Sequence, residues 1–173
     1  MPDPQRTQVW QLVQELMAGV VEAARRVDAL APGFPDELSA RDQHMEGLMV
    51  TDYLERLARH STQHRHEVAA IRASIGAARP TDPSDTHPAS GSPYARTWYH
   101  WFLLDAFLQR AALAAELVGL TDADLDRAPD PVHTAGNTRT VRQVCQHVHH
   151  VQEWILRGVQ DGVESWRRSA PQS

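Results

Sequence analysis

The chain contains no lysine, and all 17 of its basic residues are arginine. This absence excludes enzymes that form a Schiff base on a lysine and proteins that need the lysine of a phosphate-binding loop. Cys145 is the only cysteine, so no disulfide can form within the chain. No apolar run reaches the roughly 20 residues that span a bilayer, and the first residues lack the basic and apolar regions of a secretory signal. These absences predict a cytoplasmic protein with no membrane partner.

Sequence motifs of several enzyme classes are missing as well. The chain holds neither a GxSxG elbow nor a GxGxxG motif after a strand. The net charge of −5, with neutral histidines, argues against a nucleic-acid partner and against an anionic membrane surface. Histidine, by contrast, is abundant at ten residues, and it titrates or binds metal more readily than any other side chain.

Apolar residues recur at three- and four-residue steps in four segments, which is typical of helices with one buried stripe. No segment alternates with period two over a convincing length. The predicted helices are Thr7–Leu30, Thr51–Gly76, Ser92–Gly119, and Thr140 to about Gly158 or Gly162. Between the second and third helices lies a stretch rich in proline, serine and aspartate, residues 79–93, which predicts a long exposed crossover.

This pattern predicts an all-α protein, a four-helix bundle with a long crossover between helices 2 and 3. The length of 173 residues favours a single domain over 1–173. About 1–6 and 167–173 are expected to be flexible tails. A short turn is expected within 120–127, before a loop that leads to the fourth helix.

The second predicted helix carries two histidines, His60 and His64, four residues apart. Four residues make about one turn, so the two imidazoles project from the same face, beside the apolar Leu57 and Val68. On the fourth predicted helix, His147 lies on the shoulder of the apolar stripe. If these helices are neighbours, the three imidazoles could converge and hold a divalent ion with one open position. The alternative is a partly buried polar seam in which the histidines bond to carbonyls or carboxylates.

The remaining candidate residues have simpler interpretations. Asp105 interrupts an apolar run, so it either forms a structural ion pair or supports a ligand. Cys145 is expected to be a small buried hydrophobe rather than a nucleophile. A cluster of tryptophans is expected in the core rather than in a ligand cage; its members are Trp98, Trp101 and Trp154. The other histidines considered, most of them expected at the surface, are His44, His66, His87, His133, His149 and His150.

Three segments carry a family resemblance. The run Thr140-Val-Arg-Gln-Val-Cys-Gln-His147 resembles a helix of the DinB/YfiT-like superfamily, in which a Thr-Val-Arg cap leads into a helix with one metal-binding histidine. The stretch Leu117-Val-Gly-Leu-Thr-Asp-Ala-Asp-Leu-Asp-Arg127 resembles the linker common in those proteins. His60-Ser-Thr-Gln-His64-Arg65 resembles the family's second motif, a His-x-x-x-His-Arg run. The order differs, because here the histidine pair precedes the single histidine.

The resemblance implies a four-helix bundle with a three-histidine site, His60, His64 and His147, for nickel or zinc. A three-imidazole site also suits iron or copper. The family's described activities imply a metal-dependent thiol S-transferase or hydrolase acting on a small molecule, with a low-molecular-weight thiol as partner, and a homodimer. The alternative function is a non-catalytic dimeric bundle, stress-related or ligand-binding, whose histidines are structural.

Overall fold

The computed structural model describes residues 4–34, 50–77 and 98–169. Four helices make up most of these ranges: α1 (Thr7–Leu30), α3 (Val50–Ser74), α4 (Trp98–Leu117) and α5 (Val141–Ser169). Three short 3-10 turns accompany them, at Pro4–Arg6, Ala31–Gly33 and Asp124–Asp126, and the described ranges contain no strand. The all-α prediction is confirmed, and so is the short turn expected within 120–127. The predicted crossover, 79–93, lies outside the described residues.

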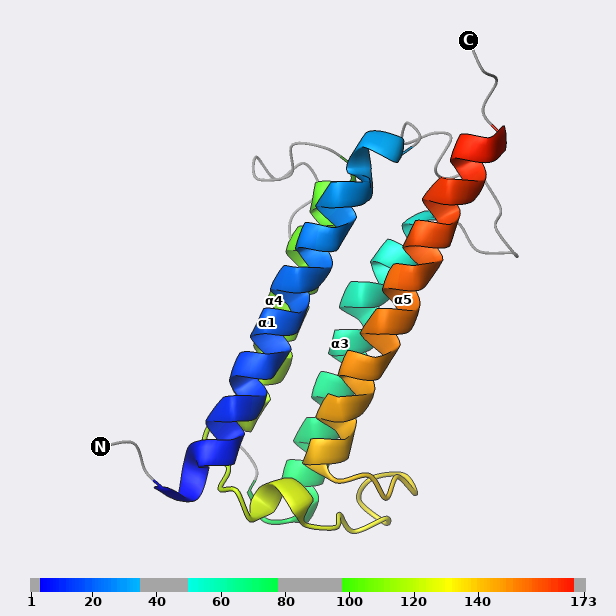
Figure 1. The fold of residues 1–173 in the computed structure, drawn as a ribbon. Coiled ribbons are helices and arrows are strands. Elements are labelled where there is room, and N and C mark those ends of the chain that lie inside the picture. The colour runs from blue at the N-terminus through cyan, green and yellow to red at the C-terminus, as the bar shows by residue number, and fades with distance from the viewer. Residues whose placement is uncertain (1–3, 35–49, 78–97, 170–173) are drawn as a thin grey trace.

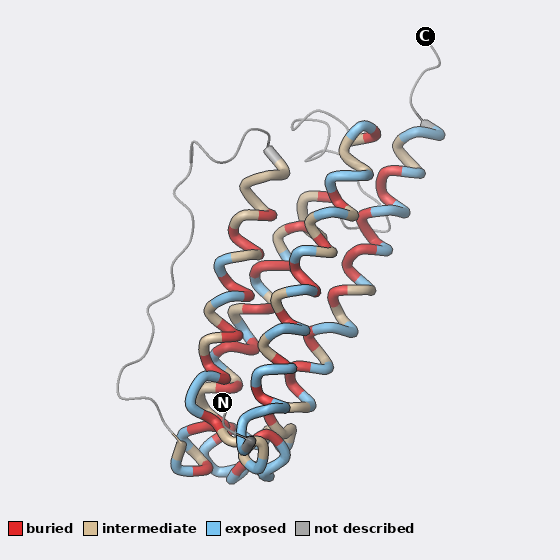
Figure 2. Tube along the Cα trace, turned by 60° about the vertical axis from the view of Figure 1, so that its left-hand side comes forward, coloured by how far each residue is buried: buried red, intermediate tan, exposed pale blue. Residues whose placement is uncertain are grey.

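The four helices run side by side along one long axis (Figure 1). The two longest, α3 and α5, are antiparallel, and α1 and α4 are antiparallel beside them. α3 packs on both α4 and α5, and α1 packs on the same two helices. Buried positions repeat along each helix on the side that faces the others, as the periodicity predicted (Figure 2).

Local signals in the sequence set several helix ends. The backbone N–H of Thr140 donates to Gln143 Oε1 at 2.9 Å, and the N–H of Gln143 donates to Thr140 Oγ1 at 3.3 Å. This reciprocal pair is the predicted capping box, and α5 begins at the next residue. α3 and α4 end just before Gly76 and Gly119, whose φ angles of 76° and 91° only glycine adopts without strain.

The predicted end of the last helix near Gly158 or Gly162 is wrong, because α5 continues to Ser169. Val159 and Val163 are fully buried and extend its apolar stripe beyond Gly158. Gly158 lies against a ring from α3: a Cβ at this position would come within 2.2 Å of Tyr53 Cε1. The glycine therefore allows a close helix–helix approach instead of ending the helix. The tail expected to be flexible from 167 is helical up to 169.

The core consists of two apolar clusters, one in each half of the bundle. Between them lies a buried polar layer centred on Arg110, whose side chain is only 2% exposed. Its Nε donates to Ser61 Oγ at 3.1 Å, its Nη2 to Gln152 Oε1 at 3.1 Å, and its Nη1 to the Leu16 carbonyl at 3.5 Å. All four helices therefore meet at one guanidinium. Ser61 follows His60 directly, so this layer lies behind the predicted histidine site.

Candidate metal centre

His60 and His64 project from the middle of α3 toward α5. Their Nε2 atoms are 3.0 Å apart, and their ring centroids are 4.3 Å apart. His64 is 1% exposed, whereas His60 is half-buried. The i, i+4 spacing explains why both rings face the same seam, and the neighbouring Leu57 and Val68 are buried as predicted.

His147 reaches the same seam from α5. Its ring centroid lies 5.2 Å from that of His60 and 4.9 Å from that of His64. One ligand nitrogen from each of the three rings lies within 4.8 Å of the other two. The structure thus brings together the three histidines that the sequence singled out, while their binding of a metal stays a prediction.

The donor set fits a divalent transition metal. Metal–nitrogen bonds of about 2.0–2.1 Å at tetrahedral angles place ligand nitrogens about 3.3 Å apart. The separation between His60 Nε2 and His64 Nε2, 3.0 Å, is close to this value, and all three donors fall within 4.8 Å. Small rotations of partly exposed imidazoles would complete the fit. Three imidazoles and no carboxylate donor would leave a fourth position for a water or a substrate atom.

A carboxylate on the same helix fixes the orientation of the buried imidazole. Glu67 Oε2 lies 2.5 Å from His64 Nδ1, one turn further along α3. If Nδ1 carries the proton and donates it to Glu67, Nε2 presents a lone pair to the seam. This carboxylate–histidine arrangement is the usual support of a metal-ligating imidazole. Without an ion, His60 Nε2–H can donate to that lone pair.

Glu67 is itself held by the loop that precedes α5. Arg139 Nε lies 3.0 Å from Glu67 Oε1, its Nη2 donates to Oε2 at 3.3 Å, and Asn137 Nδ2 donates to Oε1. The loop reaches this position through two consecutive residues with positive φ, Ala135 at 51° and Gly136 at 83°. A positive φ is unusual for alanine, so the surrounding contacts hold this conformation. We call Glu67, Asn137 and Arg139 the carboxylate clamp.

Sequence reasoning missed the whole clamp. Glu67 could have been found, because it follows His64 by three residues on a predicted helix and three residues bring side chains together. Asn137 and Arg139 lie about 70 residues further on, in a loop without periodicity, and no local signal connects them to His64.

Burial and neighbouring charges keep the three imidazoles neutral. Burial, followed by the neighbouring His64 and His147, lowers the pKa of His60 to about 3. Burial also lowers the pKa of His64, against the opposing effect of Glu67. Burial and then the Arg139 guanidinium lower the pKa of His147. Neutral imidazole is the form that binds metal, so the site needs no deprotonation at neutral pH.

These pKa values predict that the metal-free protein is sensitive to mild acid. A free histidine titrates near pH 6.5. Below that pH these histidines are therefore protonated in the unfolded chain but remain neutral in the folded protein. The free energy of unfolding should therefore fall as the pH drops from about 6.5 toward 3. Urea denaturation of metal-free protein at pH 7.5 and 5.5 measures this. His64→Gln should reduce the difference and His66→Gln, at an exposed position, should not; equal stability at both pH values would contradict the prediction.

The other titratable candidates do not contribute a nitrogen to the triad. Asp105 is buried in the polar layer and accepts a hydrogen bond from Gln109 Nε2 at 3.2 Å. His133 is exposed and pairs with Asp130 at 2.8 Å. Cys145 is buried as predicted, and burial raises the pKa of its thiol to about 12, which rules out a thiolate nucleophile at neutral pH. His66, His149 and His150 are exposed, and His44 and His87 lie outside the described residues.

The expected tryptophan core is wrong for Trp154. Its side chain is 47% exposed on α5, two turns beyond His147, and its ring lies 5.6 Å from that of Tyr53. Arg56 lies over the same ring at 5.7 Å. The indole is therefore at the outer edge of the α3–α5 seam. Trp101 is partly buried, and the side chain of Trp98 lies outside the described part.

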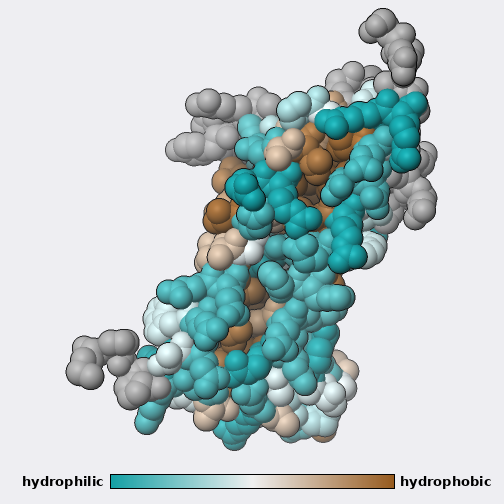
Figure 3. Space-filling view, in the orientation of Figure 1, coloured by the Kyte–Doolittle hydropathy of each residue, from teal (hydrophilic) through white to brown (hydrophobic). Residues whose placement is uncertain are grey.

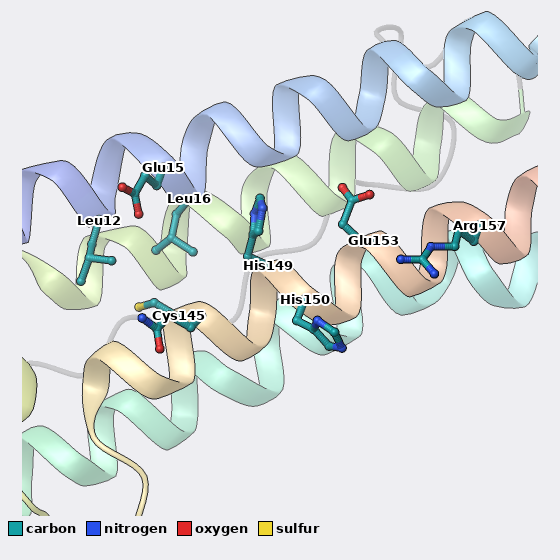
Figure 4. A pocket seen from close by; sticks show the side chains of 9 residues that line it. Leu12, Glu15, Leu16, Cys145, His149, His150, Glu153 and Arg157 are labelled. Carbon is teal, nitrogen blue, oxygen red and sulfur yellow. The ribbon is translucent and has the colours of Figure 1, made fainter.

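A hollow lies between α1 and α5 (Figure 4). It measures about 470 Å³, and Leu12, Leu16 and Cys145 give it an apolar part. On this face of the molecule, apolar residues show in the gaps between hydrophilic rims (Figure 3). None of the three clustered histidines lines this hollow, whose polar part comes from Glu15, Gln146, His149, His150, Glu153 and Arg157.

None of the helices in the described ranges is both long and apolar enough to cross a membrane. No protein-family model matches the chain, and neither the curated proteins nor the solved structures gave a match. The resemblance to the DinB/YfiT-like superfamily therefore stays a prediction, and the geometry of the site has to support any function on its own.

Proposed function

We propose that this protein is a metal-dependent enzyme acting on a small molecule, with the ion bound by His60, His64 and His147. One observation carries the proposal: three neutral imidazoles from two helices converge within 4.8 Å, and a clamped carboxylate supports the most buried one. When bound there, a divalent ion would lower the pKa of a water or thiol in the open position and make it a nucleophile at neutral pH. Nickel and zinc are the first candidates, and iron and copper also suit imidazole.

The reaction class that we propose is transfer of a low-molecular-weight thiol to an electrophilic small molecule, with hydrolysis as the variant in which water attacks. Two arguments support this class. Three imidazoles would leave one coordination position open for a water or thiol, and burial keeps the thiol of Cys145 protonated, so that this cysteine cannot act as the nucleophile. The chain's own residues would hold the ion and orient His64 through Glu67. The sequence resemblance points to the same chemistry.

A direct test is elemental analysis of protein purified without a histidine tag, followed by a thiol-transfer and hydrolase screen of metal-loaded and chelator-treated samples. We expect about one divalent ion per chain, as a single three-histidine site requires, and turnover only in the loaded sample. The competing function, a non-catalytic bundle, has one observation in its favour: His60 and His64 can bond to each other without an ion. That function would be supported if the protein is purified without metal and its melting temperature does not change when a chelator is added.

We also propose that the protein is a homodimer that pairs through the outer face of α4. An apolar stripe runs along this face at alternating three- and four-residue steps: Trp101, Leu104, Leu108, Ala111, Ala115 and Val118. Leu108 is 39% exposed and Val118 is 48% exposed. In an antiparallel two-fold pair, the large residues of one helix would face the alanines of the other. Leu108→Glu should shift sedimentation from dimer to monomer; a monomeric wild type would contradict the proposal.

A further inference from the structure

A polar pocket adjoins the triad at the carboxylate clamp. It measures about 440 Å³ and lies between α3 and the loop before α5. Its wall includes Glu67 and Arg139 of the clamp, together with the exposed amide of Gln63. None of the three histidines lines this pocket, but Glu67 also accepts the hydrogen bond from His64 Nδ1, so a single carboxylate separates a molecule in the pocket from the buried imidazole of the triad.

The charges around the triad leave the centre positive. Glu67 is the carboxylate in contact with it, and His64, Asn137 and Arg139 already engage both of its oxygens. Within the described part of the chain, Arg110 contacts only neutral groups, although its guanidinium is nearly fully buried. A divalent ion contributes two formal positive charges and the two arginines one each, against one formal negative charge from Glu67 and one from Asp105 of the polar layer, which leaves two. Uncompensated charge of this size in a partly desolvated site favours an anionic ligand.

Arg139 has one edge available for such a ligand. Its Nε and Nη2 engage Glu67, while its Nη1 makes no hydrogen bond or ion pair in the part of the chain that the structure describes. Its side chain is 39% exposed and faces the pocket that it lines. The Nη1–Nη2 edge of a guanidinium matches the two oxygens of a carboxylate, and the amide of Gln63 is a further donor on the same wall.

We propose, on the basis of the metal centre proposed above, that the substrate is a small organic molecule that carries a carboxylate, and that Arg139 binds this carboxylate in the clamp-side pocket. Its reacting group, a thiol or an electrophilic carbon, would then face the histidine triad. Arg139 is thus a specificity-determining residue as well as a member of the clamp.

Two thiols that differ only in their distal group provide the test. Protein loaded with Co²⁺ in place of the native ion is titrated with 3-mercaptopropionate and with 3-mercaptopropan-1-ol, and binding is followed by the thiolate-to-cobalt absorption band. We expect the carboxylate thiol to bind about tenfold more tightly, which is the size of one charge-assisted bidentate contact. Similar affinities in the wild type, within about twofold, would overturn the proposal without any variant.

Variants then test whether Arg139 is the residue that causes the preference for the carboxylate thiol. Arg139→Gln should reduce it to near unity, and Arg139→Lys should retain only part of it, because an ammonium keeps the charge without the planar edge. Arg157→Gln removes a guanidinium on α5, outside the carboxylate clamp, and should leave the preference unchanged. If Arg139→Gln keeps the preference for the carboxylate thiol, the assignment to Arg139 is overturned. If Arg139→Gln takes up no cobalt, Arg139→Lys decides instead, and an undiminished preference in that variant would overturn the assignment. No cobalt spectrum in the wild type would instead refute the metal centre itself, so the two failures are distinguishable.

Discussion

Replacing His64 with alanine should reduce the bound metal from about one ion per chain to background. The substitution removes one of three donors and leaves His60 and His147, which come from different helices. Two imidazoles on separate helices do not make the closed set of ligands that retains a divalent ion through purification. His64 is also the donor whose orientation Glu67 fixes, so its loss removes the best-organised ligand. Elemental analysis of untagged protein measures the effect, and titration with Co²⁺ checks it by absorption.

The matched control for this experiment is His66→Ala. His66 lies two residues further along α3 and is exposed, so its loss removes a histidine without touching the triad. Circular dichroism of both variants separates metal loss from unfolding, because His64 is buried and its removal takes from Glu67 one of its three hydrogen-bond partners. Full metal content in His64→Ala would refute the three-histidine site.

The sequence was informative where the signal is local. A period of 3.6 residues identified the helices, four-residue spacing put His60 and His64 on one face, and Thr140 with Gln143 marked the start of α5. The sequence also placed His147 at the edge of the apolar stripe of its helix. The prediction that His147 lies close to His64 depended on α3 and α5 being neighbours. The structure satisfies that condition because α3 and α5 pack as antiparallel neighbours.

Features that depend on distant segments were not predictable. Gly158 looked like a helix end, and only the ring of Tyr53 against it shows why the helix needs a glycine there and continues. Arg110 carries no local sequence signal, yet it joins all four helices through neutral partners. Burial lowers the pKa of this guanidinium to about 10, so it stays charged at neutral pH. The role of Arg110 becomes clear only in the folded structure, where Ser61 and Gln152 surround its guanidinium.

Glu67→Gln should weaken metal binding by about 10- to 100-fold, which is the usual effect of removing the group that supports a ligand histidine. Glutamine keeps the shape of the side chain, so the loss reflects charge rather than volume. The amide attracts the Nδ1 proton of His64 less strongly, which makes Nε2 a poorer donor to the ion. It also leaves Arg139 without its carboxylate and so loosens the loop that holds the clamp together. Competition with a chromophoric chelator at constant pH measures the affinity.

Glu55→Gln provides a control for this change, because Glu55 is a partly exposed acid on the same helix and pairs only with the exposed Arg59 within the described residues. It alters the net charge of the protein by the same amount and should leave the affinity for metal within about twofold, as expected for a surface pair. Equal affinity in Glu67→Gln and Glu55→Gln would show that the 2.5 Å contact does not organise the centre. A large loss in Glu67→Gln alone would link the loop before α5 to the metal, because Asn137 and Arg139 are hydrogen-bonded to that carboxylate.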